Sequence, residues 1–333
     1  MSKIYEALRQ AELDRAKTGP VQSDTGPSTS VSSQAPPDNE REPVFSSTIR
    51  STVTIPSIAK PNENKAPVSA IYAKTREEVS DSANLDLSKV RLTVWNPVQA
   101  QLPALDERGS AIEQFRSLRS RMQEFRDLNT LKSILISSGL PQEGKSFVTA
   151  NLAISFARHK AGRVLLIDGD MRRATLHKLL GCPQGPGLTE YLTGDASIVE
   201  VMQRPDSQGS DRPLPSGLAS LTFIPAGNEH DKAADLSGNQ RFGQLIAAVS
   251  PHFDWIIIDS SPVNLVSDAV NLARSCDAVL LVARGGVTKY EVAQRAVAEL
   301  KASKVLGIVL NAVKNPPATG GYYGYDGYDK IEE

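Results

Sequence analysis

The sequence predicts an α/β domain built on a mainly parallel, doubly wound β-sheet. Short runs of Val, Ile and Leu without alternating polar residues indicate strands that are buried on both faces. These runs alternate with segments of helical period, a pattern typical of β-α-β units. Two of the runs end in acidic residues and a third ends in a glycine-containing turn. Ligands of parallel sheets bind where the strands end, so we expect a site there.

The elements follow in order from these two periodicities. An edge strand is expected at Leu92–Val98. Apolar runs bounded by turn residues predict buried strands at 133–138, 163–168, 255–259, 278–283 and 305–311, with a weaker strand at 221–225. Helical spacing of apolar residues predicts helices at 110–128, 146–160, 242–249 and 289–302.

Composition divides the chain into four parts. Residues 1–18 are predicted to form a short docking helix, because Ser2 can cap it and Ile4 and Leu8 recur at helical spacing; a frayed terminus is the alternative. A disordered linker rich in Ser, Thr and Pro is predicted at 19–85. The ordered domain is expected at 86–315, and a flexible tyrosine-rich tail at 316–333.

Charge and cysteine content limit the classes of partner. The net charge is −1, so there is no global electrostatic basis for binding nucleic acid. Cys182 and Cys276 lack the spacing of a metal site or a redox pair, which favours a reduced, cytoplasmic protein. No apolar run approaches the roughly 20 residues of a membrane span. We therefore expect any attachment to the inner face of a membrane to be peripheral and to go through a partner.

Residues 139–146 read Gly-Leu-Pro-Gln-Glu-Gly-Lys-Ser and match the phosphate-binding motif G-x-x-x-x-G-K-S. The segment follows a predicted strand and opens a predicted helix, which is the context that this motif requires. Backbone N–H groups of such a loop surround a phosphate, and the helix N-terminus adds a positive dipole end. Lys145 is expected to reach the β- and γ-phosphates and Ser146 to ligate Mg²⁺. The predicted nucleotide-binding residues of this segment are Gly139, Leu140, Pro141, Gln142, Glu143, Gly144, Lys145, Ser146 and Phe147.

Three carboxylates end two of the buried strands. Asp168 and Asp170 follow one strand, and Asp259 ends another. Beside a phosphate loop these charges would repel one another strongly unless a divalent cation lay among them. Helix capping by an aspartate is the alternative, and it could explain one of the three more easily than all of them.

The combination of these motifs resembles the bacterial tyrosine kinases (BY-kinases) of the CpsD/CapB type. The resemblance rests on the strand and phosphate loop, on Leu-Leu-Ile-Asp-Gly-Asp-Met-Arg at 165–172 and on Ile-Ile-Asp-Ser-Ser-Pro at 257–262. It covers about residues 105–333. It implies a P-loop NTPase fold, ATP and Mg²⁺ as cofactors, and a cytoplasmic tyrosine autokinase of capsule or exopolysaccharide biosynthesis.

The resemblance also implies residue roles. Lys145, Asp168 and Asp170 would be catalytic, with Asp168 accepting the tyrosine proton or orienting the hydroxyl. Mg²⁺ would be held by Ser146, Asp170 and Asp259. Because a free Asp has a pKa near 3.9 and tyrosine one near 10, orientation is the larger role we expect for Asp168.

Two further residues and one departure from the family pattern concern the same site. Arg172 could neutralise phosphate charge, and an ion pair with a neighbouring carboxylate is an equally weighted alternative. Asn311 could read the nucleotide base, or it could cap the last strand.

Family members commonly have Asp-x-Pro-Pro at the third motif, where this chain has Asp-Ser-Ser-Pro at 259–262. The carboxylate is retained, but the loop after it is harder to predict.

Half of the eight tyrosines lie in the tail, at Tyr322, Tyr323, Tyr325 and Tyr328. On their own they would indicate a low-complexity end. In a chain that resembles an autokinase they are the expected autophosphorylation sites.

Glu113, Arg116 and Arg119 match the spacing E-x-x-R-x-x-R and share one helical face. In the resembled kinases this motif mediates subunit contacts in a ring, which implies a homo-oligomer. An ordinary solvated face with an internal Glu113–Arg116 pair is the alternative.

The resemblance implies further partners, and the sequence leaves competing functions open. A separate membrane-embedded polysaccharide co-polymerase would activate the kinase, and a tyrosine phosphatase would reverse its reaction; no nucleic acid is expected. The main alternative is a switch ATPase of the ParA/MinD type, which has a signature lysine where this chain has Leu140. A catalytically weak regulator is a third interpretation, against which the intact motif residues argue.

Overall fold

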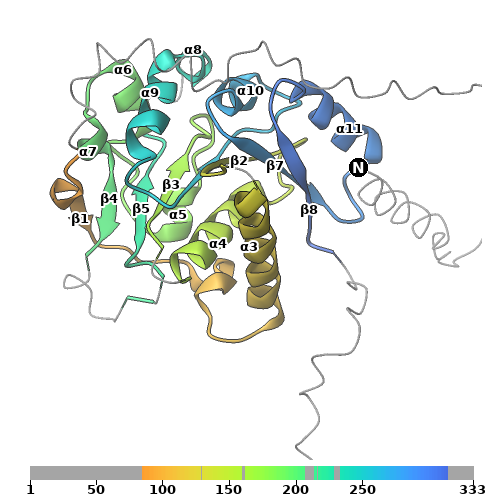
Figure 1. Ribbon diagram of the computed structural model, residues 1–333, viewed down its shortest axis with the longest axis horizontal. Coiled ribbons are helices and arrows are strands. Elements are labelled where there is room, and N and C mark those ends of the chain that lie inside the picture. Colours follow the sequence, from red (N-terminus) through yellow and green to blue (C-terminus); the bar gives the residue numbers. More distant parts are fainter. Residues whose placement is uncertain are drawn as a thin grey trace, which may run out of the picture. The chain divides into compact units, whose positions relative to one another are not determined.

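The computed structural model describes residues 85–313, apart from 129, 160–161, 207–213, 216 and 229–232. The strands of this region are β1 (Arg91–Thr93), β2 (Ser133–Ser138), β3 (Val164–Asp168), β4 (Gln203–Pro205), β5 (Leu221–Ile224), β6 (Trp255–Asp259), β7 (Ala278–Arg284) and β8 (Val305–Asn311). They form one sheet in the order β1-β4-β5-β3-β6-β2-β7-β8 (Figure 1). Every neighbouring pair is parallel except β4 and β5. The predicted mainly parallel α/β fold is confirmed.

Helices cover both faces of this sheet. The α-helices are α3 (Ser110–Leu128), α4 (Lys145–Ala157), α5 (Leu176–Leu180), α6 (Leu188–Thr193), α7 (Ile198–Val201), α8 (Ala233–Ser237), α9 (Gln240–Val249), α10 (Asp268–Ala273) and α11 (Tyr290–Glu299). Three short 3-10 turns precede α3, at Leu87–Lys89, Gln99–Gln101 and Pro103–Leu105. Among the described residues, none of these helices has the length and apolarity of a membrane span.

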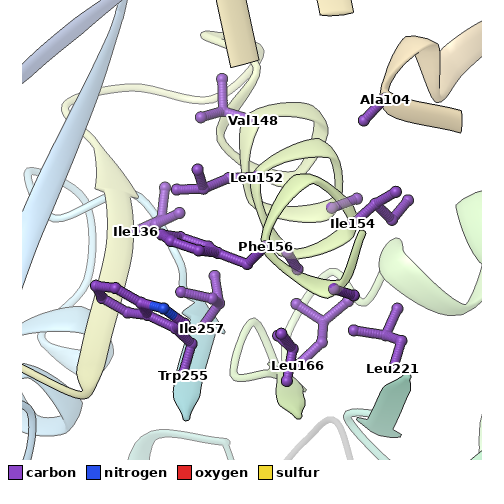
Figure 2. Close-up of a cluster of buried hydrophobic side chains, with 14 of the residues drawn as sticks. Ala104, Ile136, Val148, Leu152, Ile154, Phe156, Leu166, Leu221, Trp255 and Ile257 are labelled. Carbon is purple, nitrogen blue, oxygen red and sulfur yellow. The ribbon is translucent and has the colours of Figure 1, made fainter. Parts of the chain in front are cut away.

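The sheet separates two hydrophobic cores, and successive residues of a strand point alternately into one core and the other. Ile134 and Ile136 of β2 join the core under α3, α4 and α5, whereas Leu135 between them joins the core under α6 to α11. Figure 2 shows the first core, in which α4 lies against the sheet and Phe156 stacks on Trp255 with ring centroids 4.2 Å apart. This double burial explains why the strands lack polar alternation.

The long elements agree with the sequence prediction, and the short ones differ. The edge strand expected at Leu92–Val98 ends at Thr93. The chain then leaves the sheet, because the N–H groups of Asn96 and Val98 bond to the carbonyls of Gly181 and Leu179. β4, the helices α5 to α8 and the helix α10 are not predicted from the sequence, and they have three to six residues each. Such lengths are too short to show a helical or strand period.

Strand order places the predicted site residues together. β3, β6 and β2 are consecutive in the sheet, and their carboxyl ends share one edge. Asp168 of β3 lies directly opposite Asp259 of β6, and Ile136 of β2 lies opposite the same Asp259. β2 ends at Ser138, two residues after Ile136, and the phosphate loop begins at the next residue, Gly139. The phosphate-loop motif and two of the three carboxylates therefore converge through backbone pairing alone.

Candidate active site

The phosphate loop joins β2 to the first turn of α4. Gly144 precedes the helix in the left-handed conformation with φ of +93°. A Cβ atom on Gly144 would lie 1.9 Å from Nδ2 of Asn311, so a side chain there would displace that amide, and the positive φ would strain its backbone as well. Gln142 also has a positive φ, of 63°. These backbone angles make the tight turn that precedes the helix N-terminus, where a phosphate would meet free N–H groups.

Lys145 is the positive centre of the site. Its Nζ lies 2.6 Å from Oδ2 of Asp170 and 3.6 Å from Oδ2 of Asp259. Burial opposes its charge, but the carboxylates of Asp259 and Asp170 outweigh this effect and raise the pKa of Lys145. The ammonium therefore stays charged and is held where the three motifs meet.

Asp259 accepts hydrogen bonds from two hydroxyl groups of α4. Its Oδ2 accepts a hydrogen bond from Ser146 at 2.5 Å, and its Oδ1 accepts one from Thr149 at 3.1 Å. Thr149 is not among the residues predicted from the sequence, although it follows Ser146 by three residues and so shares its helical face. Burial raises the pKa of Asp259, and the charge of Lys145 opposes that rise.

The donor atoms at this position suit a magnesium ion. Ser146, Asp170 and Asp259 offer hard oxygen atoms, which Mg²⁺ prefers. Mg²⁺ usually binds through one or two carboxylates together with water and substrate phosphates. Asp170 and Asp259 can supply those carboxylates, because both lie within ion-pair distance of Lys145 of the phosphate loop. The residues present therefore fit a nucleotide-bound magnesium.

Asp168 is fully buried and caps a helix. Its Oδ2 accepts hydrogen bonds from the N–H groups of Thr175 and Leu176, at 3.2 and 3.1 Å, at the start of α5. Burial and, after it, the negative charge of Asp259 raise the pKa of Asp168 to about 8. The helix-capping alternative thus describes Asp168 in this structure, and a direct role towards a tyrosine hydroxyl stays a prediction.

Arg172 and Asn311 both have partners within the domain. Nε of Arg172 lies 2.6 Å from Oδ2 of Asp268, a buried residue at the start of α10. The ion-pair alternative therefore applies to Arg172, whereas phosphate binding by it stays a prediction. Asn311 ends β8 and donates from Nδ2 to the carbonyl of Glu143 at 3.0 Å, which places it against the phosphate loop.

The comparisons with known proteins agree with this geometry, although no protein-family model matches the chain. Tyrosine-protein kinase CpsD of Streptococcus agalactiae is 34% identical over 218 residues, which cover 64% of this chain and 88% of that protein. The chain belongs to this family of bacterial tyrosine-protein kinases. The kinase domain of the Escherichia coli tyrosine kinase ETK matches with a TM-score of 0.58 and 30% identity, over 68% of this chain and 85% of that one.

A longer relative is matched over less than a third of its length. Tyrosine-protein kinase Wzc of Salmonella typhimurium is 34% identical over 224 residues, which cover 65% of this chain but 29% of that protein. Membership of the tyrosine-protein kinase family confirms the predicted P-loop fold and the predicted enzyme class.

The structure describes the loop in which this BY-kinase departs from the common Asp-x-Pro-Pro pattern. The hydroxyl of Ser260 donates to the carbonyl of Ile136 at 2.9 Å, and the hydroxyl of Ser137 donates to the carbonyl of Ser261 at 2.8 Å. Both bonds join the end of β6 to β2. The Ser260 side chain and the Ser261 backbone carbonyl therefore hold the Asp259 strand against the strand that carries the phosphate loop.

The motif on α3 is divided between the surface and the interior of the domain. Arg116 pairs with Glu113, and both side chains are about two-fifths exposed. Arg119 instead donates from Nη1 to the carbonyl of Ser155 on α4 at 2.9 Å. The internal Glu113–Arg116 pair that the alternative required is present. A subunit contact through the motif stays a prediction.

The remaining predicted segments lie outside the described residues. These are the helix at 1–18, the linker at 19–85 apart from residue 85, the last two residues of the domain predicted at 86–315, and the tail at 316–333. The tail includes Tyr322, Tyr323, Tyr325 and Tyr328.

Proposed function

We propose that this protein is an ATP-dependent tyrosine autokinase that phosphorylates its own C-terminal tyrosine cluster and thereby regulates capsule or exopolysaccharide synthesis and export. The observation that carries the proposal is the position of Lys145, which lies at the phosphate loop within ion-pair distance of Asp170 and Asp259. Four acceptor tyrosines follow in the same chain. Membership of the tyrosine-protein kinase family supports this assignment over a switch ATPase.

The residues of the site divide the work of phosphoryl transfer. Bound ATP with Mg²⁺ supplies the phosphoryl group and neutralises part of its charge. Ser146, Asp170 and Asp259 would hold the metal, and Lys145 keeps a positive charge beside the loop. The raised pKa of Asp168 narrows the gap to that of tyrosine. Because its Oδ2 is engaged by the N–H groups that open α5 and its Oδ1 by the N–H of Asp170, we assign it an orienting role.

The length of the tail would allow transfer between copies of the chain. β8 ends at Asn311, against the phosphate loop, and Tyr328 follows 17 residues later. An extended segment from Lys314 to Tyr328 spans on the order of 45 Å, which is long enough to reach the site of a neighbour in a ring. Phosphorylating four tyrosines would add roughly −6 to −8 of charge, and we propose that this charge weakens the ring. Equal oligomer sizes for phosphorylated and unphosphorylated protein would contradict that proposal.

We further propose that the protein acts in the cytoplasm, at the inner face of the membrane, through a separate membrane-embedded polysaccharide co-polymerase that activates it. A tyrosine phosphatase would reset the tail. The segment 1–70 is the proposed tether to the activator. Its deletion should lower activation by the partner while Mg²⁺-ADP binding is retained. Full activation of the deleted protein would rule out the tether.

Phosphosite mapping after incubation with ATP and Mg²⁺ tests the proposed reaction. The wild-type protein should gain phosphate on the tail tyrosines, and Lys145→Ala should not. Release of free phosphate without a labelled tyrosine would contradict the kinase and support the switch ATPase.

A further inference from the structure

A second set of side chains, Glu143, Thr288 and Asn311, forms hydrogen bonds to the phosphate loop or within it. Only Glu143, which is buried, has a carboxylate; the other two are uncharged. We propose that Glu143, Thr288 and Asn311 form a hydrogen-bonded brace that sets the geometry of the loop for its nucleotide. Glu143 and Thr288 act as positioning residues, through side chains that do not themselves contact the nucleotide. The proposal rests on the nucleotide site proposed above.

The carboxylate of Glu143 links the phosphate loop to the turn after β7. Its side chain is buried, and the residue is only 4% exposed. One oxygen atom accepts the N–H of Leu140 at 2.9 Å, and the other accepts the hydroxyl of Thr288. The same hydroxyl accepts the N–H of Arg284 at 2.8 Å. A continuous chain of hydrogen bonds thus runs from the end of β7 to the first turn of the loop.

Asn311 contacts the backbone of Glu143, whereas Thr288 contacts its side chain. Its Nδ2 donates to the carbonyl of Glu143 and occupies the space that a side chain on Gly144 would need. At the other end of the loop, a Cβ on Gly139 would lie 2.9 Å from Cγ1 of Val292 and 3.2 Å from Nδ2 of Asn264. Both glycines of the motif are therefore packed closely against elements other than α4.

These contacts should act on nucleotide affinity more than on folding. In the free protein, a Glu143 carboxylate that has lost one donor can turn towards water, and the loop relaxes with it. Binding must then restore the closed loop, so the lost hydrogen bond appears as weaker binding. Removing the hydroxyl of Thr288 should raise the dissociation constant for Mg²⁺-ADP about five- to twentyfold.

Calorimetric titration of the full chain with Mg²⁺-ADP tests the brace. Thr288→Val should bind about five- to twentyfold more weakly, whereas Thr288→Ser, which keeps the hydroxyl, should stay within about twofold of wild type. Thr193→Val is a matched control. Thr193 ends α6, and its hydroxyl also donates to a carboxylate, that of Asp195, at 2.6 Å. This variant should leave the affinity unchanged. In the kinase assay, Thr288→Val should raise KM for ATP and largely preserve kcat.

A double-mutant cycle provides a second measurement. Glu143→Ala removes both acceptor oxygen atoms, whereas a Gln amide could still accept from Leu140 and donate to the hydroxyl of Thr288. If the two side chains act as one brace, the Glu143→Ala/Thr288→Val protein should bind little worse than the weaker single variant. Wild-type affinity in Thr288→Val, or strictly additive losses, would overturn the brace. Failure of the wild-type protein to bind Mg²⁺-ADP would instead overturn the proposed nucleotide site.

Discussion

The ion pairs at the strand ends and the ion pair on α3 use the same residue chemistry in opposite surroundings. Lys145, Asp170 and Asp259 have side chains that are 12%, 3% and 0% exposed. Arg116 and Glu113 are 41% and 43% exposed. Removing one partner of a buried pair leaves an uncompensated charge, at a cost of about 3–5 kcal/mol, whereas an exposed pair contributes about 0–1 kcal/mol. The buried charges are committed to one site, and the exposed pair remains available to a second subunit.

The largest expected effect is on catalysis, at the buried end of this comparison. Lys145→Ala should lower tyrosine phosphorylation at least about a hundredfold, because it removes the positive charge at the phosphate loop. Arg116→Ala should leave Mg²⁺-ADP affinity within about twofold. Both are measured on purified protein, the first by phosphotyrosine formation and the second by titration. An active Lys145→Ala protein would show that the buried pair is structural only.

Asp168 tests what burial does to a single carboxylate. Asp168→Ala should lower the free energy of unfolding by about 1–3 kcal/mol, because the N–H groups of Thr175 and Leu176 lose their acceptor. Asp168→Asn keeps an acceptor and carries no charge, so it should be at least as stable as wild type at pH 8. Urea denaturation measures both. Equal losses in the two variants would show that capping is not the source of the effect.

The pH dependence of stability sharpens the same point. The pKa of Asp168 rises from an ordinary 3.8 to about 8 in the folded protein, so the folded state holds its proton over a range in which the unfolded state has lost it. The contribution of Asp168 to the free energy of unfolding should therefore fall as the pH rises from about 4 to about 8. Denaturation of nucleotide-free wild type and Asp168→Asn at several pH values measures this fall. A constant difference between the two proteins would contradict the raised pKa.

The smallest expected effects separate Arg116 from Arg119, the two arginines of the motif on α3. Arg119→Ala should destabilise the fold by about 1 kcal/mol, because its guanidinium bonds to the carbonyl of Ser155. Arg116→Ala should change stability by less than about 0.5 kcal/mol. If the exposed pair joins subunits, Arg116→Ala should nevertheless dissociate the oligomer in a sizing experiment. An unchanged oligomer would assign the motif to the domain alone.

Local signals predicted the parts of this molecule that depend on neighbouring residues. Periodicity located α3 and β2, and the glycine and lysine spacing located the phosphate loop. The partners of that loop and of Arg172 could not be predicted, because Thr288 lies 145 residues from Glu143 and Asp268 lies 96 residues from Arg172. The capping role of Asp168 depends on α5, a helix of five residues that shows no period. Long-range contacts and very short elements therefore account for most of what sequence reasoning missed.

We propose that the site marked by Lys145 transfers phosphate to the tail of another copy of the same chain. The most direct test mixes two variants with ATP and Mg²⁺. One is Lys145→Ala with its tail intact, and the other is an active chain in which Tyr322, Tyr323, Tyr325 and Tyr328 are changed to Phe. Phosphate on the tail tyrosines of the Lys145→Ala chain is the predicted result. An unlabelled Lys145→Ala tail, under conditions in which wild-type protein labels its own, would contradict transfer between chains.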